Sequence, residues 1–143
     1  MPIWDNLEDI IDYSEPNATF HDADVHSINV DYQNTILVLQ MSICVGDPNA
    51  NTEVDREKRR LCEVTFEGLR YWTIGLPSPI SHEIKGPLWM TSDGPLKNCP
   101  TDDAKGLIKA NLPYDIQWYF YFSDLNTFAY IVATSVSFRW VSL

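Results

Sequence analysis

Residues 20–27, FHDADVHS, place two histidines and two aspartates within eight positions. Imidazoles and carboxylates are the groups that most often transfer protons in catalysis or bind metal ions. In an extended chain Asp22 and Asp24 lie on one face, about 6.6 Å apart, whereas His21 and His26 lie on opposite faces unless residues 20–23 form a turn. Because no third ligand is near in the sequence, we interpret the segment as the polar opening of a strand and predict no metal site.

A pocket is the alternative interpretation of the same segment. His82 lies in a proline-rich region and could meet His21, Asp22 and Asp24 in space, which would give a small-ligand-binding or metal-dependent enzymatic β domain. The sequence contains no glycine-rich phosphate loop, no Gly-x-Ser-x-Gly and no His-Glu-x-x-His. We therefore predict no catalytic residues and no cofactor, and we favour a binding protein over an enzyme.

The three cysteines do not point to a catalytic, disulfide or metal-binding role. Cys44, Cys62 and Cys99 are an odd number without Cys-x-x-Cys spacing, which is typical of neither a disulfide framework nor a zinc site. A reducing compartment is therefore expected. We predict that Cys44 and Cys62 are buried in strands and that Cys99, which sits in a loop, is the exposed thiol.

Charge restricts the class of partner. Twenty acidic residues oppose ten basic ones, for a net charge of −10 in 143 residues. Nucleic acid and anionic membranes both attract basic surfaces, so neither is an expected partner. The start of the chain lacks the pattern of a signal peptide, and no apolar run has the length of a membrane helix. We expect one cytoplasmic domain, residues 1–143, that binds a basic protein, with its oligomeric state left open.

The predicted contact surface combines acidic and aromatic residues. Residues 4–13 are predicted to form a helix with an apolar stripe and an acidic face, and two tyrosines lie on the outer face of a later strand. The predicted partner-binding residues are Asp5, Glu8, Asp9, Asp12, Tyr119 and Tyr121. Alternatively, the apolar stripe of this helix covers the second face of the last two strands, the face that carries Tyr119 and Tyr121. The two tyrosines would then be buried within the protein and would not contact a partner.

Alternation with a period of two predicts most of the fold. Residues 24–32 form the first expected strand, in which His26 shares a face with Ile28, Val30 and Tyr32. The other expected strands cover 35–45, 61–67, 69–74, 114–122 and 128–141, with a hairpin turn at Gln33-Asn34 and another at 123–126.

Residues 75–113 interrupt this pattern. They hold most of the prolines and four of the six glycines, and the period is lost except for a short helix near 102–110 that Thr101 could cap. We expect a long irregular excursion that serves as a lid, a binding loop or a cover. The predicted fold is mainly β (α+β): an antiparallel sheet, sandwich or half-barrel of about six strands with one N-terminal helix and this excursion.

Three stretches carry a family resemblance: FHDADVHSINVDY, TILVLQMSICV and VTFEGLRYW. Together they resemble small bacterial proteins of the polymorphic-toxin immunity type, over residues 18–74 and less closely in the final hairpin. The resemblance implies a cytoplasmic protein that blocks a cognate toxin by occlusion and so has no catalytic residues. A self-associating protein joined by strand edges is the third hypothesis, after the binding module and the pocket.

Overall fold

The computed structural model describes residues 6–12, 14–75, 86–110 and 115–141. Eight strands form one antiparallel sheet in the order β4-β7-β6-β5-β1-β2-β3-β8. The strands are β1 (Thr19–Asp31), β2 (Ile36–Cys44), β3 (Arg59–Glu67), β4 (Tyr71–Ile74), β5 (Leu88–Pro95), β6 (Ile116–Phe122), β7 (Thr127–Ala133) and β8 (Ser135–Trp140). The helices are α1 (Glu53–Arg56), α2 (Asp102–Lys109) and two 3₁₀ turns, η1 (Leu7–Ile10) and η2 (Leu96–Asn98).

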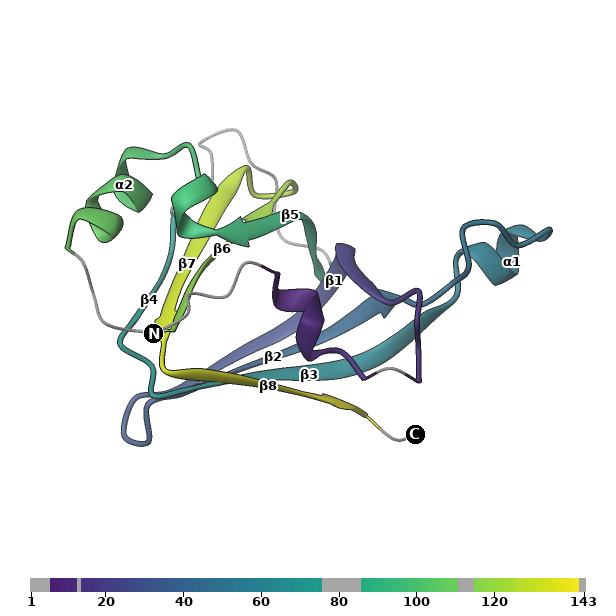
Figure 1. The fold of residues 1–143 in the computed structure, drawn as a ribbon, viewed down its shortest axis with the longest axis horizontal. Coiled ribbons are helices and arrows are strands. Elements are labelled where there is room, and N and C mark those ends of the chain that lie inside the picture. Colours follow the sequence, from purple (N-terminus) through teal and green to yellow (C-terminus); the bar gives the residue numbers. More distant parts are fainter. Residues whose placement is uncertain (1–5, 13, 76–85, 111–114, 142–143) are drawn as a thin grey trace.

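The mainly β fold class is thus confirmed, with eight strands where about six were predicted. The sheet bends into two halves, one made of β1, β2, β3 and β8 and the other of β4 to β7 (Figure 1). The main core lies on the inner side of both halves, where Phe66 of β3 meets Phe120 of β6 edge to face at 6.4 Å. Among the described residues no helix is long and apolar enough to span a bilayer.

Alternation correctly predicted the faces of β2, β3 and β6. In β2, Leu37, Leu39, Met41 and Ile43 are buried, and in β3 the same holds for Cys62, Val64 and Phe66. The polar residues between them point outward and form a chain across four strands: Ser27 donates to Gln40, Gln40 donates to Glu63, and Arg139 donates to Glu63. The predicted turns between β1 and β2 and between β6 and β7 are present too.

The predicted face of His26 is wrong because β1 contains a bulge. Val25 pairs with Met41 and Ser27 pairs with Gln40, so His26 is an extra residue on β1. The bulge reverses the alternation: Val25 is buried upstream and Ile28 packs against the core downstream. His26 is exposed instead, with its Nε2 2.7 Å from the Ser42 hydroxyl on the outer face.

A second correction concerns residues 128–141, which are two strands and not one. The chain breaks at Thr134, whose backbone N–H donates to the carbonyls of Glu67 and Gly68. β7 pairs with β4 and β6, whereas β8 pairs with β3 in the other half of the sheet. The same corner divides β3 from β4, and Gly68 turns it with a φ of +64°.

The predicted irregular excursion contains a strand in the middle of the sheet. β5 lies between β1 and β6, so this part of residues 75–113 is neither a lid nor a loop. The predicted short helix is confirmed as α2, and the Thr101 hydroxyl accepts a hydrogen bond from the Ala104 N–H at its start. Residues 76–85 and 111–114 lie outside the described residues.

The cover of the β6–β7 outer face is α2, not the N-terminal segment. Ala104 of α2 and Leu96 of η2 form a second buried cluster with Tyr130 and Val132 of β7, and α2 lies over this half of the sheet (Figure 1). Leu7 and Ile11 belong to the main core instead. The predicted helix over 4–13 is reduced, within the described residues, to the single turn η1, and Ile11 is already extended. So short a helix has little stability of its own, and the like charges along it add repulsion.

Candidate functional site

The FHDAD segment leaves the regular sheet as a wide bulge. Thr19 pairs with Cys44 and Asp24 pairs with Ser42, so five steps along β1 match two along β2. Within the bulge Asp22 adopts a left-handed conformation with a φ of 61°, which is unusual for a residue other than glycine. Ala23 remains buried and pairs with Met90 of β5. Bulges and strained backbone are concentrated at functional sites, so this segment is a candidate functional site.

Three side chains hold Asp22: that of its neighbour His21 and those of Trp89 and Arg59, which come from distant parts of the sequence. The Trp89 indole donates a 3.0 Å hydrogen bond to Asp22 Oδ1, and His21 Nε2 lies 3.3 Å from Oδ2. The Arg59 guanidinium donates to the backbone carbonyl of Asp22 at 2.8 Å. Asp22 is therefore fixed through both its side chain and its backbone.

Arg59 also connects the bulge to its neighbours. Its Nη1 donates to the Ser42 carbonyl at 3.2 Å and lies 3.6 Å from the Asp24 carboxylate. The two aspartates that the sequence singled out thus meet at one guanidinium, Asp24 through its carboxylate and Asp22 through its carbonyl. Because both partners of the Arg59–Asp24 pair are about one-third exposed, the pair mainly sets geometry and adds little stability.

A cleft of about 490 Å³ opens beside the bulge. Thr19, His21 and Asp22 line it from β1, and Cys44, Arg56 and Arg59 line it from β2, α1 and β3. The predicted pocket residues His21 and Asp22 therefore lie together at a concave site, with Asp24 next to them. His82, the fourth predicted pocket residue, lies outside the described residues.

An acidic hollow of about 230 Å³ is lined by η1 and by the residues that lead into β1. Four carboxylates line it: Glu8, Asp9, Asp12 and Glu15. Asp9 and Asp12 are exposed. The predicted partner-binding residues of the N-terminal segment therefore gather at one place, except for Asp5, which lies outside the described residues.

Three of the four carboxylates accept hydrogen bonds from other residues. Glu8 accepts hydrogen bonds from the Thr19 hydroxyl at 2.6 Å and from the Phe20 N–H at 3.1 Å. Glu15 is bound to Arg60 at 3.0 Å. Glu8 thus fixes the turn η1 against the start of β1, a structural role in addition to the partner-binding role predicted for it. Asp12 accepts a 2.9 Å hydrogen bond from the Ser14 N–H, yet it is exposed, as is Asp9, and the two form the outward acidic pair.

Tyr119 and Tyr121 are on the outer face as predicted, at some distance in the sheet from the bulge. Both rings pack against Phe128, with centroid separations of 6.0 Å for Tyr119 and 4.8 Å for Tyr121. Both side chains are half-buried, and the Tyr121 hydroxyl donates to Asn126. These contacts give the two tyrosines a structural role between β6, β7 and the η2–α2 cover.

One carboxylate faces the interior. Asp93 of β5 lies opposite Phe120 and accepts a 2.9 Å hydrogen bond from the Trp118 indole. Burial raises the pKa of Asp93; the Trp118 hydrogen bond opposes this shift, and the nearby Glu8 charge adds to it. No group of three or more metal-ligating side chains comes together in the described part of the chain.

The thiols differ from the sequence prediction. Cys99 is buried, with 4% of its surface exposed, and Cys62 is fully buried, so the predicted exposure of Cys99 is wrong. Cys44, predicted to be buried, is half-exposed and lines the cleft. Burial raises the pKa of the Cys62 thiol to about 12.

Sequence reasoning missed Trp89 and Arg59, the two residues that organise the bulge. Trp89 stands in a segment without periodicity, and Arg59 belongs to a run of basic residues that resembles a solvated loop. No local pattern in the sequence indicates either residue, and the exposure of Trp89, 47% of its surface, is known only from the structure.

The chain matches no protein-family model, no curated protein and no solved structure in the three comparisons made with it. The resemblance of residues 18–74 to immunity-type proteins therefore stays a prediction.

Proposed function

We propose that this protein is a non-enzymatic binding module whose contact surface lies around the start of β1 and accepts a basic protein partner. The observation that supports this most directly is the position of two hollows near the start of β1. Glu8 and Ala18 line the acidic hollow, and Thr19 and His21 line the cleft. Since the Thr19 hydroxyl is hydrogen-bonded to Glu8, the two hollows are close neighbours, and one partner could contact both.

The acidic hollow suits a lysine or arginine of the partner. Asp9 and Asp12 are exposed beside a concavity, and the whole chain carries a net charge of −10. A field of one sign speeds the encounter with a partner of the opposite sign and disfavours acidic partners. The hollow provides the position at which such a side chain would dock.

Trp89 suits the centre of the same surface. Its indole is 47% exposed, yet its N–H is fixed by Asp22 and its backbone N–H by the Asp124 carboxylate. Tryptophan and arginine are the residue types most enriched at the centres of protein interfaces. A side chain that is already held in place loses little conformational freedom on binding.

The narrower form of the proposal is an immunity protein that occludes a basic toxin. It rests on the resemblance of residues 18–74 to immunity-type proteins, and the acidic hollow is compatible with it. Occlusion requires no catalytic group, in keeping with a module that works by contact alone.

The cleft itself favours a second candidate function, the binding of a small ligand. Its lining combines an imidazole, a thiol and two guanidiniums in about 490 Å³, a volume within the range of small-molecule sites. Native mass spectrometry of the purified protein tests this candidate directly. A bound molecule that is lost in the His21→Ala variant would favour the ligand-binding function over the protein-binding one.

The test of the leading proposal is a quantitative pull-down from a lysate of the source organism. The baits are the wild-type chain, Asp9→Asn/Asp12→Asn and Trp89→Ala. The matched control is Glu67→Gln/Asp103→Asn, which removes the same charge from exposed residues that line neither hollow. We expect one basic protein to be retained by the wild type and the control and lost by both test variants.

Calorimetry with the purified partner then separates charge from shape. The affinity should fall as the salt concentration rises, because screening weakens exposed charge pairs. If the wild-type bait retains no specific protein, or if both test variants retain it as well as the wild type does, the proposal is wrong.

A further inference from the structure

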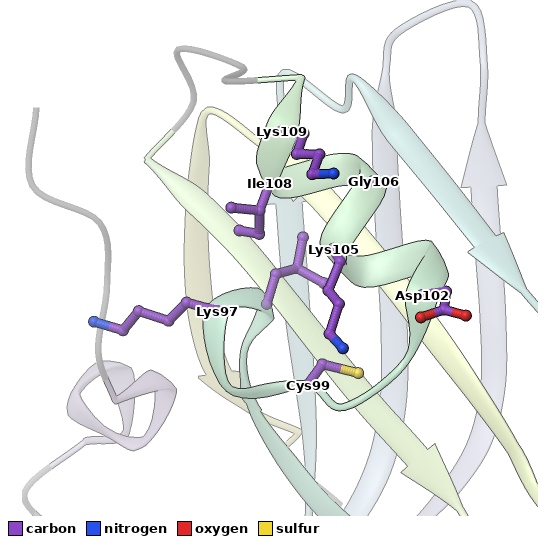
Figure 2. Close-up of a pocket in the computed structure, with 8 residues that line it drawn as sticks. Lys97, Cys99, Asp102, Lys105, Gly106, Ile108 and Lys109 are labelled. Atoms are coloured by element: carbon purple, nitrogen blue, oxygen red, sulfur yellow. The ribbon is translucent and has the colours of Figure 1, made fainter.

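A third concave surface lies far from the β1 segment in the sequence, between η2 and α2 (Figure 2). It has a volume of about 540 Å³. Leu96, Cys99 and Ile108 contribute apolar surface. Lys97, Lys105 and Lys109 contribute ammonium groups, and Asp102 contributes one carboxylate. The lining is therefore partly apolar, with a net positive charge, in a chain that is acidic overall.

The apolar part exceeds what the fold requires. Ala104 and Leu107 already pack α2 onto Tyr130 and Val132 of the sheet. Ile108 is the next residue along the helix, about 100° further round, and it is 38% exposed. An exposed isoleucine beside a hollow offers an apolar contact that the described part of the chain does not use.

The basic part brings like charges together. Lys105 and Lys109 are four residues apart on α2 and so lie on one side of the helix, where like charges repel. In Figure 2 the Lys105 side chain runs toward Cys99 and the Lys109 side chain lies near the end of α2, whereas Lys97 points away from both. An anion between the two ammonium groups would convert this repulsion into attraction. The net charge of −10 does not prevent this at contact, because charges more than about 8 Å away are largely screened at physiological salt.

Gly106 leaves space for an occupant. It lies inside α2, where glycine is the least favourable residue after proline. A Cβ atom added at Gly106 would meet no atom within 4 Å. The glycine thus exposes helix backbone to the hollow without any need in the fold of the described residues.

From these features we propose that the η2–α2 hollow binds an anionic amphiphile, namely a medium-chain carboxylate. Its aliphatic chain would lie along Leu96, Cys99 and Ile108, and its carboxylate would be held by Lys105 and Lys109. The helix is roughly 12 Å long for its eight residues, which suits a chain of medium length. This proposal does not depend on the protein-binding function.

The test is a titration of the ¹⁵N-labelled protein with decanoate, in which the amide chemical shifts are recorded at each decanoate concentration. All concentrations stay below the critical micelle concentration of decanoate. We expect saturable shifts at residues 96–109. The cationic analogue decyltrimethylammonium is the probe control and should give no saturable shift there. Absence of saturation with decanoate, or equal binding of the cationic probe, would overturn the proposal.

Two variants locate the site. Gly106→Leu should fill the hollow and abolish binding, whereas its melting temperature should equal or exceed that of the wild type because a helix-interior glycine is removed. Gly106→Ala is the size control and should bind as the wild type does. Decanoate binding that survives Gly106→Leu would place the ligand elsewhere and contradict the assignment.

A third variant tests the headgroup contact. Lys105→Gln/Lys109→Gln should weaken decanoate by about tenfold, the loss expected for two exposed charge contacts. Lys58→Gln/Arg70→Gln removes the same charge at exposed positions that do not line the hollow and should change the affinity less than about twofold. Equal losses in the two double variants would mean that net charge, and not this site, controls binding. Binding to anionic vesicles without decanoate binding would instead indicate a membrane-contact surface.

Discussion

The indole of Trp89 donates a 3.0 Å hydrogen bond to the carboxylate of Asp22, which lies 67 positions earlier in the sequence. The bond spans two neighbouring strands, because Trp89 on β5 pairs with Asp24 on β1. It therefore links an exposed aromatic residue to the one left-handed residue of the FHDAD bulge, Asp22. The hydrogen bond thus joins Trp89, which a partner would contact, to Asp22, whose backbone shapes the cleft.

The first prediction concerns this link. Asp22→Ala should lower the free energy of unfolding by about 1–2 kcal/mol, because alanine keeps the left-handed cost and loses the acceptor for Trp89. Asp22→Asn should stay within about 0.5 kcal/mol of the wild type, since asparagine tolerates this conformation and retains an acceptor oxygen. Urea denaturation measures both. Equal values for the two variants would mean that neither the conformation nor the bond contributes to stability.

The second prediction concerns the corner of the sheet. A Cβ atom at Gly68 would lie 2.3 Å from the Thr134 hydroxyl oxygen, and the residue has a φ of +64°. Gly68→Ala should therefore destabilise the protein by about 2–3 kcal/mol through backbone strain and overpacking. Gly106→Ala, where the space is open, should stabilise it by about 0.5–1 kcal/mol. Thermal unfolding of the Gly68→Ala and Gly106→Ala variants measures both changes in stability. If Gly68→Ala left the stability unchanged, the corner would have to relax freely around the added methyl group.

Local periodicity was enough for the strands that have one clearly apolar face. In β2 Met41 stands between Gln40 and Ser42, and in β3 the inward residues Val64 and Phe66 alternate with glutamate and threonine. The faces could therefore be predicted before any pairing was known. The cap of α2 was predictable for a similar reason, because the Thr101 hydroxyl accepts a hydrogen bond from the N–H of Ala104, only three residues away. Such features depend on residues close together in the chain.

β5 could not be predicted because its strand conformation comes from its partners. Its sequence, LWMTSDGP, has no regular alternation and ends in glycine and proline. It is extended because β1 and β6 pair with it on both sides, and Gly94 is needed where Tyr119 crosses close to the backbone. The division of residues 127–140 into β7 and β8 also depends on a distant residue, Gly68, since the alternation of apolar residues continues through Thr134.

The candidate site was half predictable for the same reason. The sequence places His21, Asp22 and Asp24 together, so their common location followed from their spacing. Arg59 and Trp89 join them from 37 and 67 positions away, and no local pattern indicates either contact. The bulge that brings His21 and Asp22 to the cleft also depends on pairing with β5.

The third prediction uses the three thiols. Under native conditions iodoacetamide should modify Cys44 first, because it is the half-exposed cysteine and lines the cleft. Cys62, fully buried with its pKa raised to about 12, and Cys99, 4% exposed, should react only when the protein unfolds. Peptide mass spectrometry at timed intervals measures each site, with Cys44→Ser as the control. Fastest reaction at Cys99 would contradict the structure and restore the loop predicted from the sequence.

The fourth prediction concerns the interior carboxylate of Asp93, whose pKa is raised above 3.8, chiefly by burial. The folded protein then keeps the Asp93 proton to a higher pH than the unfolded chain does. Folding is therefore favoured while the side chain is protonated, and this contribution declines as the pH rises from 3.8 through the folded-state pKa.

Asp93→Asn should remove that decline. Asparagine stays neutral, and its side-chain oxygen can still accept the hydrogen bond from Trp118, so the core contact at 2.9 Å is preserved. The stability of Asp93→Asn relative to the wild type should rise as the pH increases above about 4, the region in which an aspartate of the unfolded chain loses its proton. Urea denaturation at a series of pH values measures the difference. Asp9→Asn, at an exposed position, is the matched control; a constant difference between Asp93→Asn and the wild type at every pH would show that Asp93 titrates alike in the folded and unfolded states.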